Sequence, residues 1–296
     1  MEQFIGTGVA LVTPFTENGA IDFPALERIV EHNIQGGVDY LVVLGTTGES
    51  VTLSKEEKKQ VAQKVSTVNA GRLPLVLGIG GNNTAAVAQQ LRETDLSEYD
   101  GVLSVSPSYN KPTQEGIYQH FKVLAQASPK PIIMYNVPSR TGSNMLPETT
   151  VRLAKDFDNI LGIKEACGNS IQIDAILQTK PDDFLVISGD DFTALSTVLA
   201  GGSGVISVLG QGLPQEFSQM IRFGIQTQSK EAYQIHHQLM PLMHMIFEEG
   251  NPAGIKSIFE HLGLSGASVR LPLVEASGPL KQKITNFLKS LSQVSA

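Results

Sequence analysis

Residues 184–208, with the sequence FLVISGDDFTALSTVLAGGSGVISV, contain the repeating unit that decides the fold. Two short apolar runs stand at its ends, Phe184–Ser188 and Gly204–Val208, and their apolar residues follow one another almost without a break. Such continuous runs are typical of strands that are buried on both faces, as in parallel sheets. Asp190-Asp191 between the runs is a helix start signal. The segment therefore predicts a strand, a helix and a second strand parallel to the first.

The same unit recurs through the part of the chain that precedes this segment. The six further runs are Val9–Val12, Tyr40–Leu44, Leu75–Ile79, Gly101–Val105, Pro131–Tyr135 and Ile160–Lys164. Helix start signals lie between them, among them Asp22-Phe-Pro24, the capping box Ser54-Lys-Glu-Glu57 and Asn83-Thr84. Eight strands, each followed by a helix within roughly 225 residues, predict an α/β fold of the (β/α)8 (TIM) barrel type. A doubly wound open sheet is the alternative, but the first run is followed by Thr13-Pro-Phe15 without the glycine fingerprint of that fold.

The strand signal stops near Thr227. The segments Lys230–Glu248, Pro252–Leu262 and Pro279–Leu291 all have helical spacing. We therefore expect a catalytic barrel over residues 1–226 and a small C-terminal helical region over residues 227–296.

Composition excludes several classes of function. The 296 residues include 22 Lys and Arg against 29 Asp and Glu, for a net charge of −7, which argues against nucleic-acid binding. No apolar run approaches the ~20 residues that a membrane span needs, and the first residues lack the pattern of a signal peptide. The one cysteine, Cys167, allows no intrachain disulfide. A cytoplasmic protein that binds neither membrane nor nucleic acid is expected.

Lys164 is the strongest candidate for chemistry, because it ends the sixth apolar run and catalytic groups of barrel enzymes lie at the C-terminal ends of the strands. Burial in an apolar mouth would lower the pKa of its ammonium and make a neutral amine available to form an imine with a carbonyl compound. The alternative is a structural lysine that pairs with a carboxylate such as Glu165 or Asp190.

Other strand ends carry polar side chains with two interpretations each. Tyr135 could pass protons beside an imine, or could belong to the core. Thr46 and Thr47 lie in a glycine-flanked turn that could bind a carboxylate, or could only connect a strand to a helix. Arg140, in a loop after Pro138, could bind a carboxylate or could be a surface charge.

Metal and nucleophile signatures are weak. The six histidines lack the spacing of metal ligands, and the glycines around Ser203 lack the spacing of a nucleophile elbow. The glycines at 201–204 could cradle a phosphate, or could let the eighth strand approach the substrate closely. Cys167 is better explained as a small packed residue than as a nucleophile.

Taken together, the motifs resemble the dihydrodipicolinate synthase (4-hydroxy-tetrahydrodipicolinate synthase) family, within the superfamily that includes N-acetylneuraminate lyase. The resemblance runs from about Gly8 to the last helices. Its motifs are Gly45-Thr-Thr-Gly-Glu-Ser50, Tyr109-Asn110, Tyr135-Asn-Val-Pro-Ser-Arg-Thr-Gly142, Gly162-Ile-Lys-Glu165 and Gly189-Asp-Asp191.

The resemblance implies a class I aldolase-type lyase that condenses pyruvate with L-aspartate 4-semialdehyde in lysine and diaminopimelate biosynthesis. Lys164 would form the imine, and Tyr135 would relay protons with Thr46 and Tyr109. No metal and no organic cofactor are expected.

Substrate recognition and assembly follow from the same resemblance. Thr47, the backbone near Ile206, and Gly189 would bind pyruvate or its partner, and Arg140 would bind the carboxylate of the semialdehyde. The residue that matches Tyr109 reaches into a neighbouring subunit's site in the family, so a homotetramer built as a dimer of dimers is expected.

Two alternatives stay open: a sister lyase that acts on a sugar acid, and a non-catalytic barrel that binds a keto acid. The resemblance also predicts weak inhibition by free L-lysine. Of the residues that bind lysine in sensitive family members, this chain keeps Ser50 and Asn82. The other positions differ, with Lys55 and Lys58 for histidines, Ala86 for a glutamate and Ser108 for a tyrosine.

Overall fold

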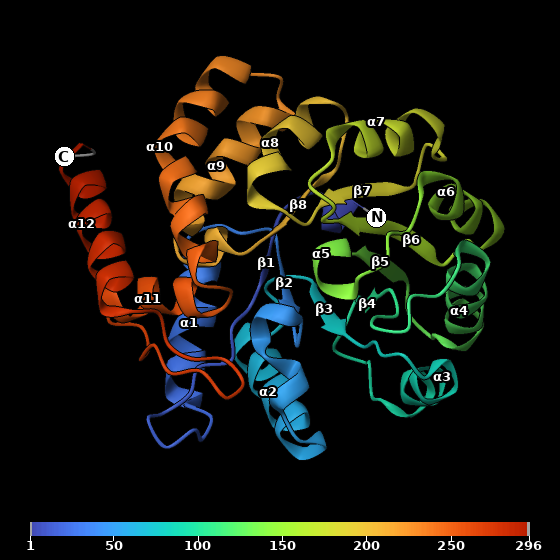
Figure 1. The fold of residues 1–296 in the computed structure, drawn as a ribbon, viewed down its shortest axis with the longest axis horizontal. Helices are drawn as coiled ribbons and strands as arrows, with labels where there is room; N and C mark the ends of the chain where they lie inside the picture. Colours follow the sequence, from blue (N-terminus) through green and yellow to red (C-terminus); the bar gives the residue numbers. More distant parts are fainter. Residues whose placement is uncertain (1, 295–296) are drawn as a thin grey trace.

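The computed structural model describes residues 2–294 and contains a closed barrel of eight parallel strands in sequence order (Figure 1). The strands are β1 (Gly6–Ala10), β2 (Tyr40–Val43), β3 (Leu75–Gly78), β4 (Gly101–Val105), β5 (Ile132–Asn136), β6 (Ile160–Glu165), β7 (Leu185–Ser188) and β8 (Gly204–Ser207). Strand β8 pairs with β1 and closes the barrel. The predicted (β/α)8 barrel is confirmed.

Helices surround this barrel. They are α1 (Phe23–Gln35), α2 (Lys55–Asn69), α3 (Thr84–Glu93), α4 (Gln114–Ala127), α5 (Pro138–Thr141), α6 (Pro147–Asp156), α7 (Ser170–Thr179), α8 (Asp191–Leu199) and α9 (Pro214–Ile225). Short 3-10 turns are η1 (Glu2–Phe4), η2 (Thr46–Gly48), η3 (Ser50–Thr52) and η4 (Leu209–Gln211). The expected start signals are present: Asp22 caps α1, and Ser54 and Glu57 form a complete capping box on α2.

Two apolar layers hold these elements together. A small cluster inside the barrel includes Tyr40, Ile133 and Tyr135, whereas a larger cluster fills the space between the strands and the helices. Phe4 of η1 closes the N-terminal end of the barrel, with its ring edge against Tyr40 at a centroid distance of 5.5 Å.

Strand β1 begins three residues earlier than the expected Val9–Val12. The reason is a close approach of two backbones, because a Cβ atom on Gly204 would lie 2.0 Å from the carbonyl oxygen of Gly6. Glycine at 204, with φ of 146°, lets β8 pair with β1 at this point. Neither sequence interpretation of residues 201–204, a phosphate cradle or a close approach to the substrate, included this contact between two strands.

A bulge in β6 decides where Lys164 points. Ile132 pairs with Ile160, but Ile133 pairs with Gly162, so Leu161 is an extra residue on β6. As a result Lys164, and not its neighbour, lies opposite Tyr135, which belongs to the cluster inside the barrel. Side chains opposite each other on neighbouring strands share a face, so Lys164 points into the barrel.

The C-terminal region adds α10 (Ser229–Glu248), α11 (Ala253–His261) and α12 (Gly278–Val294). Figure 1 shows α10 packed beside α9, and α12 at the outer edge of the molecule. The link between α11 and α12 reaches back to α2, where Arg270 pairs with Glu57 at 2.5 Å.

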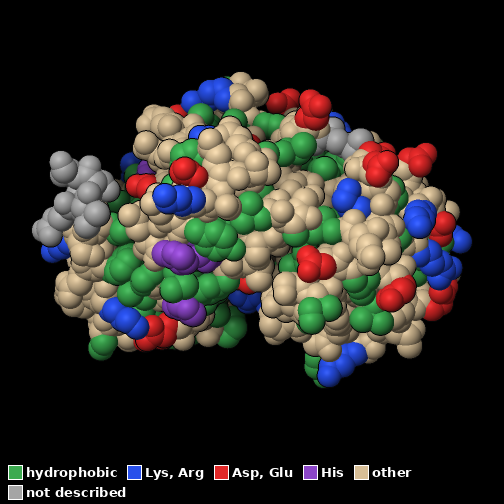
Figure 2. Space-filling model, turned by 90° about the horizontal axis from the view of Figure 1, so that it is seen from above, with side chains coloured by type: hydrophobic (Ala, Val, Ile, Leu, Met, Phe, Trp, Pro, Cys, Tyr) green, Lys and Arg blue, Asp and Glu red, His purple; other side chains and the backbone are tan. Residues whose placement is uncertain are grey.

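Charged side chains of both signs are scattered over the face of the molecule shown in Figure 2. Acidic and basic side chains alternate over the face in Figure 2, without a continuous basic patch. Within residues 2–294, no helix is both long and apolar enough to cross a bilayer.

Candidate active site

Lys164 lies at the C-terminal end of β6, one residue before the strand ends, and its side chain is only 5% exposed. Its Nζ is 4.3 Å from the centre of the Tyr135 ring, which comes from the neighbouring strand β5. Burial lowers the pKa of Lys164 to about 7, opposed by the charge of Asp191 and assisted by that of Arg140. A large fraction of this amine is therefore neutral near pH 7.

The alternative of a structural ion pair does not hold for Lys164. Among the described residues its Nζ has no carboxylate within 4.0 Å. Glu165 points elsewhere and accepts hydrogen bonds from Asn136 at 2.9 Å and Gln172 at 3.0 Å. Asp190 caps the first turn of α8. A buried lysine without an ionic partner has the properties that a Schiff-base nucleophile needs.

Two further side chains, Thr46 and Arg140, act on the Tyr135 phenol beside this amine. Burial raises the pKa of the Tyr135 phenol, and the Arg140 charge together with a hydrogen bond to the Thr46 side chain opposes that rise. Tyr135 thus connects Lys164 to Thr46 of η2. Arg140 is exposed on α5, a short helix of four residues where a loop was expected. Pro138 starts this helix, and Gly142 ends it in the left-handed region.

The turn η2 after β2 carries the two threonines in different environments. Thr46 is exposed toward solvent, whereas Thr47 is 2% exposed and its Oγ1 accepts a hydrogen bond from Asn251 Nδ2 at 2.9 Å. Glu49, two residues after Thr47, is buried and forms an ion pair with Lys256 of α11 at 2.6 Å. The turn is therefore attached to the C-terminal region.

Gly189, directly after β7, lies beside the Lys164 side chain. A Cβ atom on Gly189 would lie 3.0 Å from Cγ and Cε of Lys164, so the absence of a side chain at 189 leaves space for the lysine. Ile206 is fully buried on β8, inside the barrel. Two residues that follow Ile206 are bound to Asp191, whose carboxylate accepts hydrogen bonds from Ser207 Oγ at 2.6 Å and from the Leu209 N–H at 2.8 Å.

Tyr109 makes none of these contacts within the described part of the chain. Its side chain is 91% exposed, its φ is 67°, and its N–H donates to the carbonyl of Thr141 at 3.1 Å. The neighbouring Ser108 is bonded to Asn82, whose amide donates to the Ser108 carbonyl at 2.6 Å and accepts from the Ser108 N–H at 2.8 Å. The two polar atoms of the Asn82 amide are thus already engaged.

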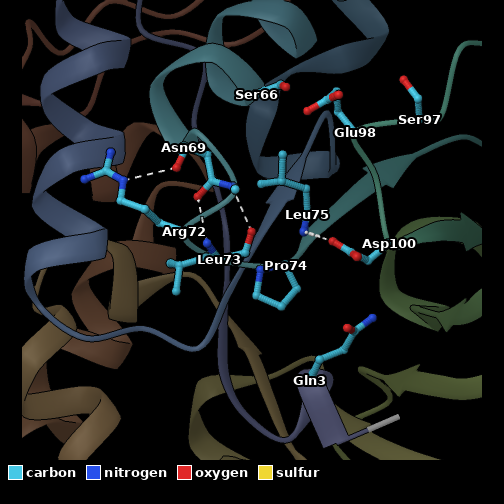
Figure 3. Close-up of a pocket in the computed structure, with 11 residues that line it drawn as sticks. Gln3, Ser66, Asn69, Arg72, Leu73, Pro74, Leu75, Ser97, Glu98 and Asp100 are labelled. Atoms are coloured by element: carbon cyan, nitrogen blue, oxygen red, sulfur yellow. Dashed lines mark hydrogen bonds between the residues drawn. The ribbon is translucent and has the colours of Figure 1, made fainter.

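A separate hollow of about 360 Å³ lies at the opposite end of the barrel, where β3 and β4 begin (Figure 3). Some of its polar groups are engaged with one another: Asn69 exchanges two hydrogen bonds with Leu73, and Asp100 accepts from the Leu75 N–H. Catalytic groups in barrels lie at the other end, so the hollow is not a candidate site.

Several residues near the mouth were not identified from the sequence. Lys256 is fully buried, and Asn251 makes a contact with Thr47 that no local pattern reveals. Asp191 stands in the motif 189–191, but its hydrogen bond from Ser207 could not be predicted from that motif. The positions of Glu49 inside the motif 45–50 and of Asp191 inside the motif 189–191 were the available signals. Over the described residues, no group of three or more His, Cys, Asp or Glu side chains is placed to hold a metal ion.

Comparison with known proteins identifies the family to which the chain is similar. A sequence profile described as the Dihydrodipicolinate synthetase family matches residues 3–291. A protein named 4-hydroxy-tetrahydrodipicolinate synthase from Flavobacterium psychrophilum is 60% identical over 293 residues, which cover 99% of this chain and 100% of that protein.

Solved structures of dihydrodipicolinate synthases are similar to this chain over nearly its whole length. A dihydrodipicolinate synthase from Thermotoga maritima superposes with a TM-score of 0.95 at 38% identity, over 97% of this chain and 98% of that one. A chloride-inhibited dihydrodipicolinate synthase from Acinetobacter baumannii, complexed with pyruvate, gives 0.92 at 38% identity, over 96% and 98%. The chain belongs to the dihydrodipicolinate synthetase family.

Proposed function

We propose that this chain is a lyase that condenses pyruvate with L-aspartate 4-semialdehyde to give 4-hydroxy-tetrahydrodipicolinate, on the route to diaminopimelate and lysine. The observation that carries the proposal is Lys164, a buried amine with no ionic partner and a pKa lowered to about 7, placed beside a phenol at the barrel mouth. The names of relatives at up to 60% identity along the whole chain support the choice of reaction.

The chemistry begins with attack of the neutral Lys164 amine on the keto carbon of pyruvate. Loss of water gives an imine, and loss of a methyl proton gives the enamine that attacks the aldehyde carbon of the second substrate. We infer that Tyr135 carries these protons, because Lys164 Nζ lies over its ring and its hydroxyl is hydrogen-bonded to the Thr46 side chain. The iminium accepts the electron pair of the C–H bond that loses its proton. These steps therefore need neither a metal nor an organic cofactor.

Charge recognition is divided between two parts of the mouth. Thr47 and the backbone near Ile206 bind the carboxylate of pyruvate, and Gly189 leaves the lysine free to reach it. Arg140 on α5 binds the carboxylate of the semialdehyde through its planar guanidinium. Its charge already acts on both Lys164 and Tyr135, which supports this placement.

The site is completed by a neighbouring subunit. A phenol that is 91% exposed in one chain, like that of Tyr109, contributes to a proton relay only when another surface covers it. We infer that Tyr109 enters the site of a second copy, within a homotetramer built as a dimer of dimers. A cytoplasmic location suits an enzyme of amino-acid biosynthesis.

Trapping with borohydride tests the proposal. Borohydride with pyruvate should inactivate the enzyme and leave a reduced pyruvyl adduct on the peptide that carries Lys164, as measured by mass spectrometry. Turnover with the semialdehyde should exceed turnover with a panel of sugar-acid aldehydes, and Lys164→Ala should lose both labelling and most activity. Labelling at another lysine would refute the mechanism, and preference for a sugar acid would refute the substrate.

A further inference from the structure

The Thr47 hydroxyl has an unusual hydrogen-bonding state. It is almost fully buried and accepts from Asn251 Nδ2 at 2.9 Å, but it donates to no acceptor among the described residues. A hydroxyl has one proton and two lone pairs, so with a lone pair occupied by the amide its proton is left for another acceptor. A buried donor without a partner is costly unless a ligand satisfies it.

Asn251 itself is held in place with little freedom. It lies between α10 and α11 and is 8% exposed. Its Oδ1 is buried without a hydrogen-bond partner in the described part of the chain, so this side chain keeps its position at a cost in folding free energy. Unsatisfied groups of this kind call for an explanation, and a functional role is one.

A buried ion pair fixes the turn and the C-terminal region to each other at a second point. The Lys256 amine donates to Glu49 Oε1 at 2.6 Å and to the Ser268 carbonyl at 2.8 Å. The other carboxylate oxygen of Glu49 accepts from the Arg270 N–H at 2.9 Å. Because Thr47 and Glu49 are two residues apart, these contacts leave the Thr47–Asn251 pair little room to rearrange.

We propose that Asn251 is a positioning residue for recognition of the keto acid. By donating to Thr47, its amide occupies the lone pair on that side and directs the hydroxyl proton toward the substrate carboxylate. A carboxylate only accepts hydrogen bonds, so a hydroxyl in this state is complementary to it. The inference rests on the proposed role of Thr47 in binding pyruvate.

The decisive change is Asn251→Asp, which keeps the shape of the side chain and removes its donor. The new carboxylate only accepts, so the Thr47 hydroxyl turns its proton toward it and away from the substrate. The half-saturating pyruvate concentration for borohydride trapping at Lys164 should rise on the order of tenfold or more, with the maximal trapping rate little changed. Asn251→Ala should raise the half-saturating pyruvate concentration less, because the Thr47 hydroxyl is then free to turn toward the substrate.

Two controls separate positioning from a general loss of structure. Pyruvamide lacks the carboxylate, so its half-saturation should change much less than that of pyruvate, whereas a loosened fold would affect both alike. Asn286→Asp makes the same charge change at an exposed position of α12 and should leave trapping unchanged. In a Thr47→Val background, Asn251→Ala should add little further effect.

The outcomes are distinct. Failure of wild-type protein to be labelled by pyruvate would refute the proposed function itself. Normal labelling of the wild type with unchanged half-saturation in Asn251→Asp, or equal changes for pyruvate and pyruvamide, would overturn the role of Asn251 alone. Should Asn251→Asp not fold, the pair of Thr47→Val and Asn251→Ala decides the matter, because strictly additive effects would overturn the coupling.

Discussion

Lys164→Met should inactivate the protein and at the same time make it more stable. Methionine has a similar length and no charge, so it suits the apolar surroundings of this side chain. Burial lowers the pKa of Lys164 from its usual 10.5 to about 7. At about 1.36 kcal/mol per pH unit, keeping this amine in the folded protein costs roughly 4 kcal/mol at pH 7.

The pH dependence has a definite sign. Above pH 10.5 the lysine is neutral in both the folded and the unfolded chain, so it costs nothing. As the pH falls from 10.5 to 7, the unfolded chain takes up a proton that the folded chain does not, and the free energy of unfolding decreases. Below pH 7 the amine is protonated in both states and the cost stays constant. The gain from Lys164→Met should therefore shrink to roughly 1 kcal/mol at pH 9.5.

Urea unfolding of wild type and variant at pH 7 and pH 9.5 measures this difference. The subunit concentration must be the same throughout, because assembly contributes to apparent stability. Lys155→Met is the matched control, since Lys155 is exposed and should show neither the gain nor its pH dependence. A variant no more stable than the wild type at pH 7, or a gain of equal size at both pH values, would refute the account of Lys164 as a desolvated amine.

Three further predictions concern substrates, assembly and regulation. Arg140→Ala should leave pyruvate trapping at pH 8 nearly unchanged but weaken use of the semialdehyde by roughly 2–5 kcal/mol in kcat/KM, and equal loss of both steps would make the arginine structural. Tyr109→Phe should impair turnover, and mixing it with Lys164→Ala subunits should restore some activity; confirmed mixed dimers without rescue would contradict a role across the interface. Free L-lysine at non-saturating pyruvate should inhibit weakly or not at all, because Ala86 and Ser108 lack the charge and the phenol expected of a lysine site. Half-inhibition below millimolar lysine would contradict that prediction.

The fold could be predicted from the sequence because its signals are local. Apolar runs such as Ile160–Lys164 and the capping box at Ser54 depend on a few adjacent residues, and the structure has a strand and a helix start at these places. The first strand was misplaced because Gly6 has no side chain to form an apolar run; its pairing depends on contact with Gly204, far away in the chain.

The site was only partly predictable, for a related reason. The position of Lys164 at a strand end could be read from its apolar run, but its direction depends on a bulge that only the pairing with β5 reveals. Asn251 and Lys256 act on residues more than 200 positions earlier in the chain, and nothing in their own neighbourhood indicates that contact.

Two buried lysines near the barrel mouth differ in the property that the proposed reaction needs. Burial lowers the pKa of Lys256 to about 8 and that of Lys164 to about 7, so loss of solvation alone hardly separates them. Their hydrogen-bond partners distinguish the two lysines. The Lys256 amine donates to the Glu49 carboxylate at 2.6 Å and to the Ser268 carbonyl at 2.8 Å. Deprotonating it would leave Glu49 as an unpaired buried charge, which is strongly unfavourable. Lys164 has no such partner among the described residues and faces a phenol at the mouth of the barrel. In the proposed reaction Lys164 is the nucleophile, because the fold buries its amine and also leaves it without a counter-charge among the described residues.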